Sequence, residues 1–217
     1  MSDYSILYID EETTDNHQFE RKMSEEFDVS TVDFTDITFE KLTSDLMEKD
    51  FDYLIVDYHL NDKSGCGFNG DEVIKEFVGK FPHFPTMLLT NHDQHAVDSV
   101  EGLDVDTIHN KKEYVDEERR EVFIKRIKAK IDNYRDEIKG AEERIAALIE
   151  KKRSGSDLTA NEEQEIVDLD TLLDETLGGD RSIPDDIKSP TNALRIESLL
   201  SKTDDLIARL KEYENIS

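Results

Sequence analysis

The chain of 217 residues has one cysteine, four prolines and no tryptophan. A single cysteine, Cys66, excludes an intrachain disulfide and fits a reducing compartment. No apolar run approaches the length of a membrane span, and the acidic opening MSDYSILYID lacks the apolar core of a signal peptide. These absences predict a soluble, cytoplasmic protein that makes no contact with a membrane.

Basic residues are also scarce, with 27 against 53 acidic residues and a net charge of -26. So acidic a chain is not expected to bind DNA, RNA or anionic lipid through bulk charge. Charged residues make up 37% of the sequence and hydrophobic residues 36%, which indicates long solvated helices. No Walker-type loop is present, and GCGFNG at 65–70 matches GxGxxG by letter only, because it does not follow directly on the expected strand at 53–56; nothing therefore favours nucleotide binding.

Residues 4 to about 112 alternate short apolar runs with helix-type segments. The apolar runs do not themselves alternate with polar residues, which is typical of strands buried on both faces. Alternation of this kind predicts βαβ units and one parallel sheet. Strands are expected at 4–9, 29–34, 53–56, 85–90 and 106–110, and helices at 13–27, 39–49, 70–81 and 95–102.

Polar side chains follow several of these strands. Asp10 and Glu11 follow the first, Asp57 the third, Thr90 ends the fourth and Lys111 follows the fifth. Because ligands bind beyond the carboxyl ends of parallel strands, we expect these side chains to meet at one edge of the sheet. Any one of them alone would fit a loop cap or a single ion pair, and only their convergence favours a site.

Crowded carboxylates need a cation to stay ionised together, and Mg²⁺ prefers carboxylates, a carbonyl and shared phosphate oxygens. An aspartate beside Mg²⁺ can attack a phosphoryl group and carry it as an acyl phosphate. A hydroxyl and an ammonium would then hold the phosphoryl oxygens. The pattern therefore predicts a phosphoacceptor site with Mg²⁺ as its cofactor.

The stretches ILYIDEE, YLIVDYHLND, MLLTN and DTIHNK resemble, in order and spacing, the receiver domain of bacterial two-component response regulators. The resemblance covers about residues 4 to 112 and implies a flavodoxin-like fold with strand order 2-1-3-4-5. It implies the following roles: Asp57 as phosphoacceptor; Asp10, Glu11, Asp57 and the backbone carbonyl of His59 as Mg²⁺ ligands; Thr90 as switch hydroxyl; Lys111 as the lysine that pairs with the phosphoryl group.

This sequence departs from the family pattern at several positions. Glu11 stands where aspartate is commoner, and Asn91 where alanine or glycine is preferred. Ile108 replaces the usual aromatic switch residue. Lys112 replaces a frequent proline and leaves open which lysine reaches the phosphoryl group. His59 and His92 occupy positions that tune the lifetime of the phosphoryl group in the family. Asn61 and the lengthened DKSGCGFNG loop are further differences.

Beyond residue 113 the pattern is purely helical. Thr159 is interpreted as the cap of a helix that ends near Gly178. In the same way, Thr14 and Asp15 are interpreted as the caps of the helix expected at 13–27 in the first part of the chain. Apolar residues recur at a and d heptad positions, which predicts either a coiled coil or a three-helix bundle. The heptad residues are Ile124, Ile127, Ile131, Tyr134, Ile138, Ala141, Ile145 and Leu148.

A third helix is expected at about 190–214. Residues 119–153 carry a net charge of +5 (12 bases, 7 acids) and residues 154–217 of -10 (6 bases, 16 acids), which favours pairing within the chain. The basic stretch lacks interleaved aromatic residues, so no nucleic acid is expected as a partner. Isoleucines at the a positions favour instead a parallel homodimer, and this alternative stays open.

We therefore predict a receiver domain at 1–118 and a helical output or interaction region at 119–217. The expected function is that of a response regulator in a phosphorelay, not an enzyme. Its partners would be a sensor histidine kinase or phosphotransfer protein, and a downstream protein bound by the helical tail. The alternative is a pseudo-receiver that is never phosphorylated and acts as a scaffold or adaptor subunit.

Overall fold

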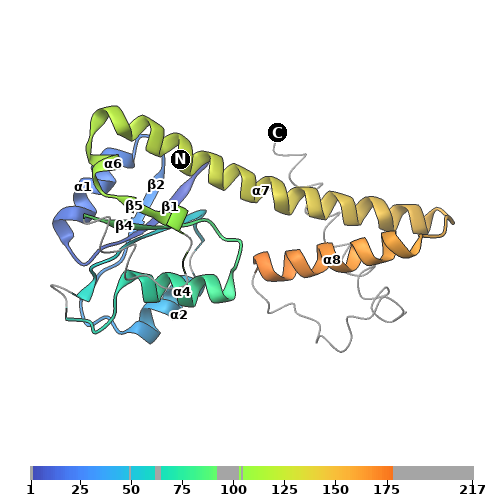
Figure 1. Ribbon diagram of the computed structural model, residues 1–217, viewed down its shortest axis with the longest axis horizontal. Coiled ribbons are helices and arrows are strands. Elements are labelled where there is room, and N and C mark those ends of the chain that lie inside the picture. Colours follow the sequence, from blue (N-terminus) through green and yellow to red (C-terminus); the bar gives the residue numbers. More distant parts are fainter. Residues whose placement is uncertain (1, 49, 62–64, 92–102, 104, 178–217) are drawn as a thin grey trace. The chain divides into compact units, whose positions relative to one another are not determined.

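A computed structural model gives the structure of residues 2–48, 50–61, 65–91, 103 and 105–177 (Figure 1). The helices predicted at 95–102 and 190–214 lie outside these residues, as do His92 and His95. Among the described residues, no helix combines the length and the apolarity that a membrane crossing needs.

Five parallel strands form one sheet in the order β2-β1-β3-β4-β5, which confirms the predicted flavodoxin-like topology. The elements of this region are β1 (Ser5–Ile9), α1 (Thr13–Met23), β2 (Asp28–Thr31), α2 (Phe39–Glu48), β3 (Tyr53–Asp57), α4 (Gly70–Lys80), β4 (Thr86–Thr90), the 3-10 helix η1 (Val105–Thr107), β5 (Ile108–Asn110) and α6 (Lys112–Val115).

Each face of the sheet is covered by helices, because successive side chains of a strand point to opposite faces. In β1, Leu7 and Ile9 belong to the core shared with α2 and α4. Ile6 and Tyr8 belong to the core shared with α1 and the next long helix. Burial on both sides explains why the strand sequences are continuously apolar.

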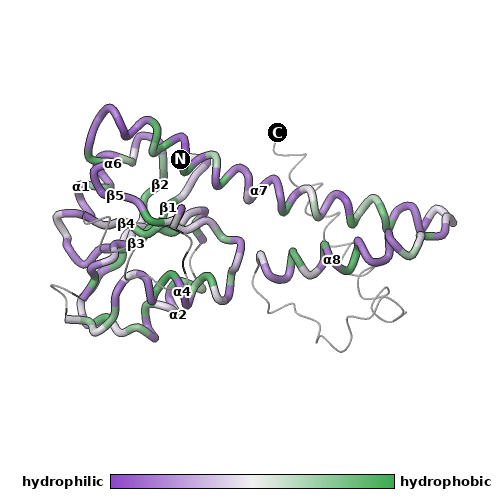
Figure 2. The backbone as a smooth tube through the Cα atoms, viewed as in Figure 1, coloured by the Kyte–Doolittle hydropathy of each residue, from purple (hydrophilic) through white to green (hydrophobic). Residues whose placement is uncertain are grey.

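Helix α7 (Glu117–Arg153) begins on the second of these faces. Phe123, Ile127 and Ile131 are fully buried there with Tyr8 and Phe19. The first part of the predicted heptad stripe therefore packs on the sheet and not on a partner helix. Figure 2 shows the short hydrophobic stretches that recur among hydrophilic ones along α7.

The rest of the stripe packs on α8 (Ala160–Leu177). Ala141 and Ile145 of α7 form one buried cluster with Leu173 of α8, and Leu148 forms a second with Ile166. Two ion pairs join the same helices, Arg144 with Glu165 and Lys151 with Glu162, each with an N···O distance of 2.7 Å. The two predicted alternatives are pairing of the basic and acidic helices within one chain and a parallel homodimer. Pairing of α7 with α8 within the chain accounts for the burial of Ala141, Ile145 and Leu148.

Capping explains where α8 begins. The Thr159 hydroxyl accepts the Glu162 backbone N–H at 3.3 Å, and the Glu162 carboxylate accepts the Thr159 backbone N–H at 2.9 Å. This reciprocal capping box confirms Thr159 as the cap. In contrast, the predicted caps of α1 are wrong: Glu12 is the N-cap, and Thr13 already begins the helix. Asp15 lies in the first turn of α1, and its carboxylate pairs with Lys111 instead of capping the helix.

Contacts divide the chain into two compact units, Met1–Tyr134 and Arg135–Ser217. The first turns of α7 belong to the first unit because their apolar face closes its core. The division into a receiver domain at 1–118 and a helical output or interaction region at 119–217 stays a prediction.

Burial of α7 on the sheet predicts that Ile127→Ala destabilises the first unit. Removing three buried carbons should lower the free energy of unfolding by about 2–5 kcal/mol. Val122, one turn away and 58% exposed, is the matched control, and Val122→Ala should change stability by less than about 0.5 kcal/mol. Urea unfolding of the full chain measures both; equal, small effects would contradict the packing of α7 on the sheet.

Candidate functional site

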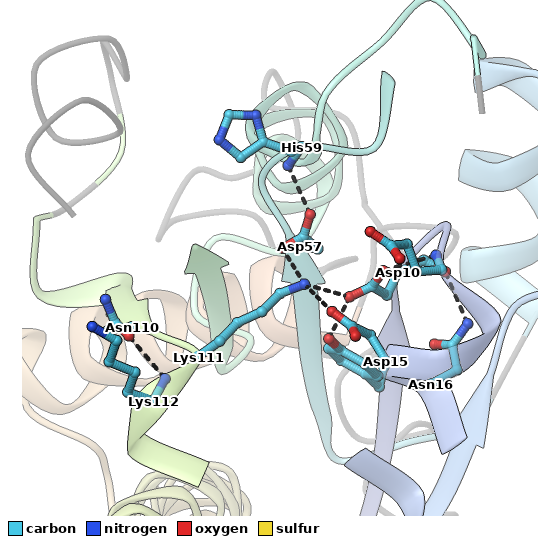
Figure 3. A network of polar contacts seen from close by, with 10 residues as sticks. Asp10, Asp15, Asn16, Asp57, His59, Asn110, Lys111 and Lys112 are labelled. Carbon is cyan, nitrogen blue, oxygen red and sulfur yellow. Dashed lines mark hydrogen bonds and ion pairs between the residues drawn. The ribbon is translucent and has the colours of Figure 1, made fainter. Parts of the chain in front are cut away.

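The predicted site residues meet at the carboxyl edge of the sheet. Asp10 follows β1, Asp57 ends β3, Thr90 ends β4 and Lys111 follows β5. All four are buried, Asp10 and Thr90 completely. Figure 3 shows the side chains of Asp10, Asp57 and Lys111 pointing toward one another from these different elements. The structure thus brings together what the strand-end pattern predicted.

Lys111 is the centre of this arrangement. Its ammonium Nζ lies 2.7 Å from Asp10 Oδ2, 2.8 Å from Asp15 Oδ2 and 2.9 Å from Asp57 Oδ1. The Lys112 side chain points away from the carboxylates, and its backbone N–H donates to Asn110 Oδ1 at 2.8 Å (Figure 3). Of the two candidate lysines, Lys111 therefore reaches Asp57.

Three carboxylates are close enough to share one cation. Oxygens of Asp10, Glu11 and Asp57 lie within 4.8 Å of one another. Glu11 Oε2 is buried and, within the part of the chain that the structure describes, accepts no hydrogen bond. A divalent cation would supply the missing partner, and an all-oxygen ligand set suits Mg²⁺. The residues present therefore fit the predicted Mg²⁺ site, with Glu11 able to serve in place of an aspartate.

The phosphoacceptor candidate has both carboxylate oxygens engaged. Asp57 Oδ1 pairs with Lys111, and Oδ2 accepts the His59 backbone N–H at 2.8 Å. The role of the His59 carbonyl as a metal ligand stays a prediction. Each contact holds the carboxylate in one orientation, which a nucleophile needs.

Burial and neighbouring charges together raise the pKa values of Asp57, Glu11 and Lys111, each through a different balance. Burial raises the pKa of Asp57, and the ammonium of Lys111 opposes the rise only in part. Burial, together with the charges of Asp10 and Asp57, raises the pKa of Glu11 to about 7. Burial alone would lower the pKa of Lys111, but Asp57 and Asp10 outweigh it and raise that pKa. The carboxylates are thus crowded and the lysine stays charged.

Three residues that hold the site were not predicted from the sequence. The Tyr8 hydroxyl donates to Asp10 Oδ2 at 2.6 Å, and the Asn16 amide donates to the Asp10 carbonyl at 2.9 Å. Asp15 binds Lys111 as described above. Tyr8 is fixed in turn by its ring, which stacks on Phe19 at 4.1 Å between centroids. Their nearness to Asp10 in sequence was the available signal.

Thr90, Asn91 and Ile108 stand at the positions where the resemblance implies a switch or a departure from the family pattern. The Thr90 carbonyl accepts the Lys111 backbone N–H at 3.0 Å, which fixes β4 against the start of α6. Asn91 is exposed, and Ile108 is partly buried against the core on the α2 and α4 side. The roles of Thr90 and Ile108 in switching stay predictions.

Gly70 lets α4 begin against the site. A Cβ atom at this position would lie 1.9 Å from the Asp57 carbonyl oxygen and 2.9 Å from Val56 Cγ1. The Gly70 backbone N–H also donates to the Tyr58 carbonyl at 3.0 Å. The absence of a side chain therefore sets how closely α4 approaches the backbone of Asp57.

No family model matches the sequence, and no curated protein matches it. Among solved structures, the chain is similar to the response regulator TrrA from Thermotoga maritima in complex with Mg²⁺-BeF, with 21% identity over 57% of this chain and 98% of that one and a TM-score of 0.45. It is also similar to the signal receiver domain of an HD domain-containing protein from Pseudomonas fluorescens Pf-5, with 12% identity over 61% and 92% and a TM-score of 0.48.

A third similar structure is the response regulator RcsB from Salmonella typhimurium, with 16% identity over 97% of this chain and 93% of that one and a TM-score of 0.43. At these identities and TM-scores, the three likenesses carry no weight for function. The predicted resemblance to receiver domains is confirmed as a resemblance of fold, by the strand order and the helices on both faces.

The close approach at Gly70 predicts that Gly70→Ala forces α4 or the Asp57 backbone to move. Overpacking against backbone should lower the free energy of unfolding by about 1–3 kcal/mol. Gly79, near the end of the same helix, has nothing within 4 Å of its ideal Cβ. Gly79→Ala should instead stabilise by about 0.5–1 kcal/mol. Urea unfolding distinguishes the two, and a neutral Gly70→Ala would refute the proposed tight fit.

Proposed function

We propose that the chain is a two-component response regulator whose first unit accepts a phosphoryl group on Asp57. The observation that carries this proposal is the Lys111 ammonium 2.9 Å from Asp57 Oδ1, at an edge where Asp10 and Glu11 complete a cation-binding set. A structural ion pair needs one acid for one base, whereas here three carboxylates surround Lys111. The surplus of buried acid favours a site that binds a further cation.

The transfer uses Asp57 as the nucleophile. One carboxylate oxygen attacks the phosphorus of a donor such as acetyl phosphate, a new O–P bond forms, and the O–P bond to acetate breaks. Acetate leaves with the bonding electron pair, so no proton needs to move in this step. Lys111 then donates to a phosphoryl oxygen and offsets its charge.

Asp10, Glu11 and Asp57 are the side chains that would hold Mg²⁺. The ion, when bound, supplies charge neutralisation for the carboxylates and for the incoming phosphoryl oxygens. Asp10 is already oriented by Tyr8 and by the Glu12 backbone N–H, which donates to Oδ1 at 2.9 Å. Such fixed partners reduce the reorganisation that cation binding requires.

The donor in the cell would be a sensor histidine kinase or a phosphotransfer protein, and the protein itself would act as an acceptor, not as an enzyme, in the cytoplasm. The output would be a protein contact made by the helical region, here represented by α7 and α8. The pairing of α7 with α8 supports this, because the hairpin offers a long charged surface. The RcsB structure concerns DNA interaction by that protein; for this chain we propose no nucleic-acid partner.

A second candidate is a pseudo-receiver that keeps the fold as a scaffold. The contact of Asp15 with Lys111 favours it, since a third carboxylate neutralises the lysine without any phosphoryl group. The exposed Asn91 and the Lys112 substitution at family positions point the same way. Phosphorylation of Asp57 decides between the two candidates.

Incubation of the full chain with acetyl phosphate and Mg²⁺ should add one phosphoryl group, measured by intact mass. Asp57→Asn should abolish the adduct because the amide cannot form an acyl phosphate. Omission of Mg²⁺ should abolish it as well, since the carboxylates would repel the donor. No adduct on the wild-type chain, together with no Mg²⁺ binding by calorimetry, would establish the scaffold candidate instead.

The two adjacent lysines provide a matched test of the site. Lys111→Met should slow adduct formation by about tenfold or more, because an ammonium is lost beside the transferred group. Lys112→Met removes the same charge one residue away and should leave the rate within about twofold. Equal rates for the two variants, followed by intact mass over time, would contradict the assignment of Lys111.

A further inference from the structure

Asp15 is a fourth acid at the site, supplied by the first turn of α1. Its Oδ2 lies 2.8 Å from Lys111 Nζ, and its side chain is 27% exposed, whereas those of Asp10 and Asp57 are almost fully buried. Figure 3 shows the carboxylate facing the ammonium beside Asp10. The sequence pattern marked this residue only as a helix cap, close to Asp10 along the chain.

The donors of Lys111 are fully accounted for. An ammonium has three N–H donors: two donate to Asp10 and Asp15, and Asp57 Oδ1 lies 2.9 Å away as an ion-pair partner. Two of these acceptors, Asp10 and Asp57, also belong to the group of three acids that can share a cation. Asp15 does not belong to that group as found among the described residues.

The difference between Asp15 and the two acids of the cation set, Asp10 and Asp57, becomes important when a cation and a phosphoryl group bind at the site. A cation on Asp10 and Asp57 would draw electron density from the oxygens that hold Lys111, so those two contacts weaken together. Once Asp57 carries a phosphoryl group, its carboxylate charge is lost, and the third N–H of Lys111 can donate to a phosphoryl oxygen. The contact with Asp15 is untouched by either change.

We infer that Asp15 is a positioning residue for phosphoryl transfer, which anchors the Lys111 ammonium beside Asp57 while the other two carboxylates are engaged by a cation and by the phosphoryl group. The inference rests on the proposed function and adds to it a residue from α1. Asp15 touches neither the cation set nor Asp57 directly, and it acts through Lys111 alone.

The opposite role for Asp15, competition with the phosphoryl group for Lys111, predicts a different effect on the rate of transfer. If Asp15 competed with the phosphoryl group for Lys111, its removal would speed transfer. Competition is disfavoured because two N–H groups of Lys111 donate to Asp10 and Asp15, which leaves the third for the phosphoryl group, so Asp15 need not be displaced.

Rates of adduct formation with acetyl phosphate at saturating Mg²⁺ test the inference on the full chain. Asp15→Asn should slow the reaction by about tenfold, as expected for loss of a charge-assisted hydrogen bond. Asp15→Ala should slow it at least as much. Glu20→Gln is the control, because Glu20 lies on the same helix, loses the same charge and pairs only loosely with His17 at 3.9 Å; its rate should stay within about twofold.

A double variant shows whether Asp15 acts through Lys111. Adding Asp15→Asn to Lys111→Met should slow transfer no further than Lys111→Met alone. A merely structural role would instead slow both backgrounds by the same factor. An equal further loss, or a faster Asp15→Asn reaction, would overturn the inference.

Two measurements do not depend on transfer. With Mg²⁺ and beryllium fluoride bound, the ¹⁵N-labelled Lys111 ammonium should show slow hydrogen exchange in the wild type and faster exchange in Asp15→Asn. The Mg²⁺ Kd measured by calorimetry should change by less than about threefold, because Asp15 is not part of the cation set. Unchanged ammonium exchange would show that Asp15 anchors nothing.

The two proposals fail in different ways. No adduct on the wild-type chain overturns the proposed function and, with it, any part for Asp15 in transfer. An adduct that forms equally fast on the wild type and on Asp15→Asn leaves the proposed function standing and overturns the role of Asp15 alone.

Discussion

The ion cluster around Lys111 is the constraint that the rest of the first unit serves. Buried carboxylates are costly unless a cation neutralises them, so the acids at this edge can coexist only if strands far apart in sequence deliver them to one lysine. The sheet register does this. Ile9 lies beside Val56, so Asp10 and Asp57 emerge at one level. Asp57 lies beside Leu89 and Leu89 beside His109, so Lys111 follows two residues beyond that level at the same edge.

The alternation of side chains across the sheet connects this cluster to α7. Tyr8 points to the face covered by α1 and α7, stacks on Phe19, and ends in the hydroxyl that holds Asp10. Phe19 in turn meets Tyr114 edge-on at 5.0 Å, next to the buried Phe123 of α7. A continuous run of packed aromatic rings thus leads from the acids to the helix that continues into the second unit.

The sequence was sufficient to predict the fold class and the main site residues, because both follow from apolar runs that end in charged residues. Asp15 was missed since an acid in a first helical turn satisfies local capping rules equally well, and its true partner is 96 residues away. Gly70 was missed for a similar reason: the close backbone at Asp57 exists only in three dimensions. The heptad stripe of α7 was found correctly, but periodicity does not name the partner, which is first the sheet and then α8.

Charge balance ties the chemistry of the site to its architecture. Asp10, Glu11, Asp15 and Asp57 face one ammonium, so the fully ionised cluster carries a formal charge of -3 (four acids, one base). Under the proposed function, a phosphoryl group would bring further negative charge to this edge, and its transfer would be favourable only with a divalent cation held there at the same time. Binding of the cation and retention of the phosphoryl group would then favour each other by the same free energy, because linkage is reciprocal. Lys111 alone would not replace the cation, since its ammonium already donates to Asp10 and Asp15 and pairs with Asp57.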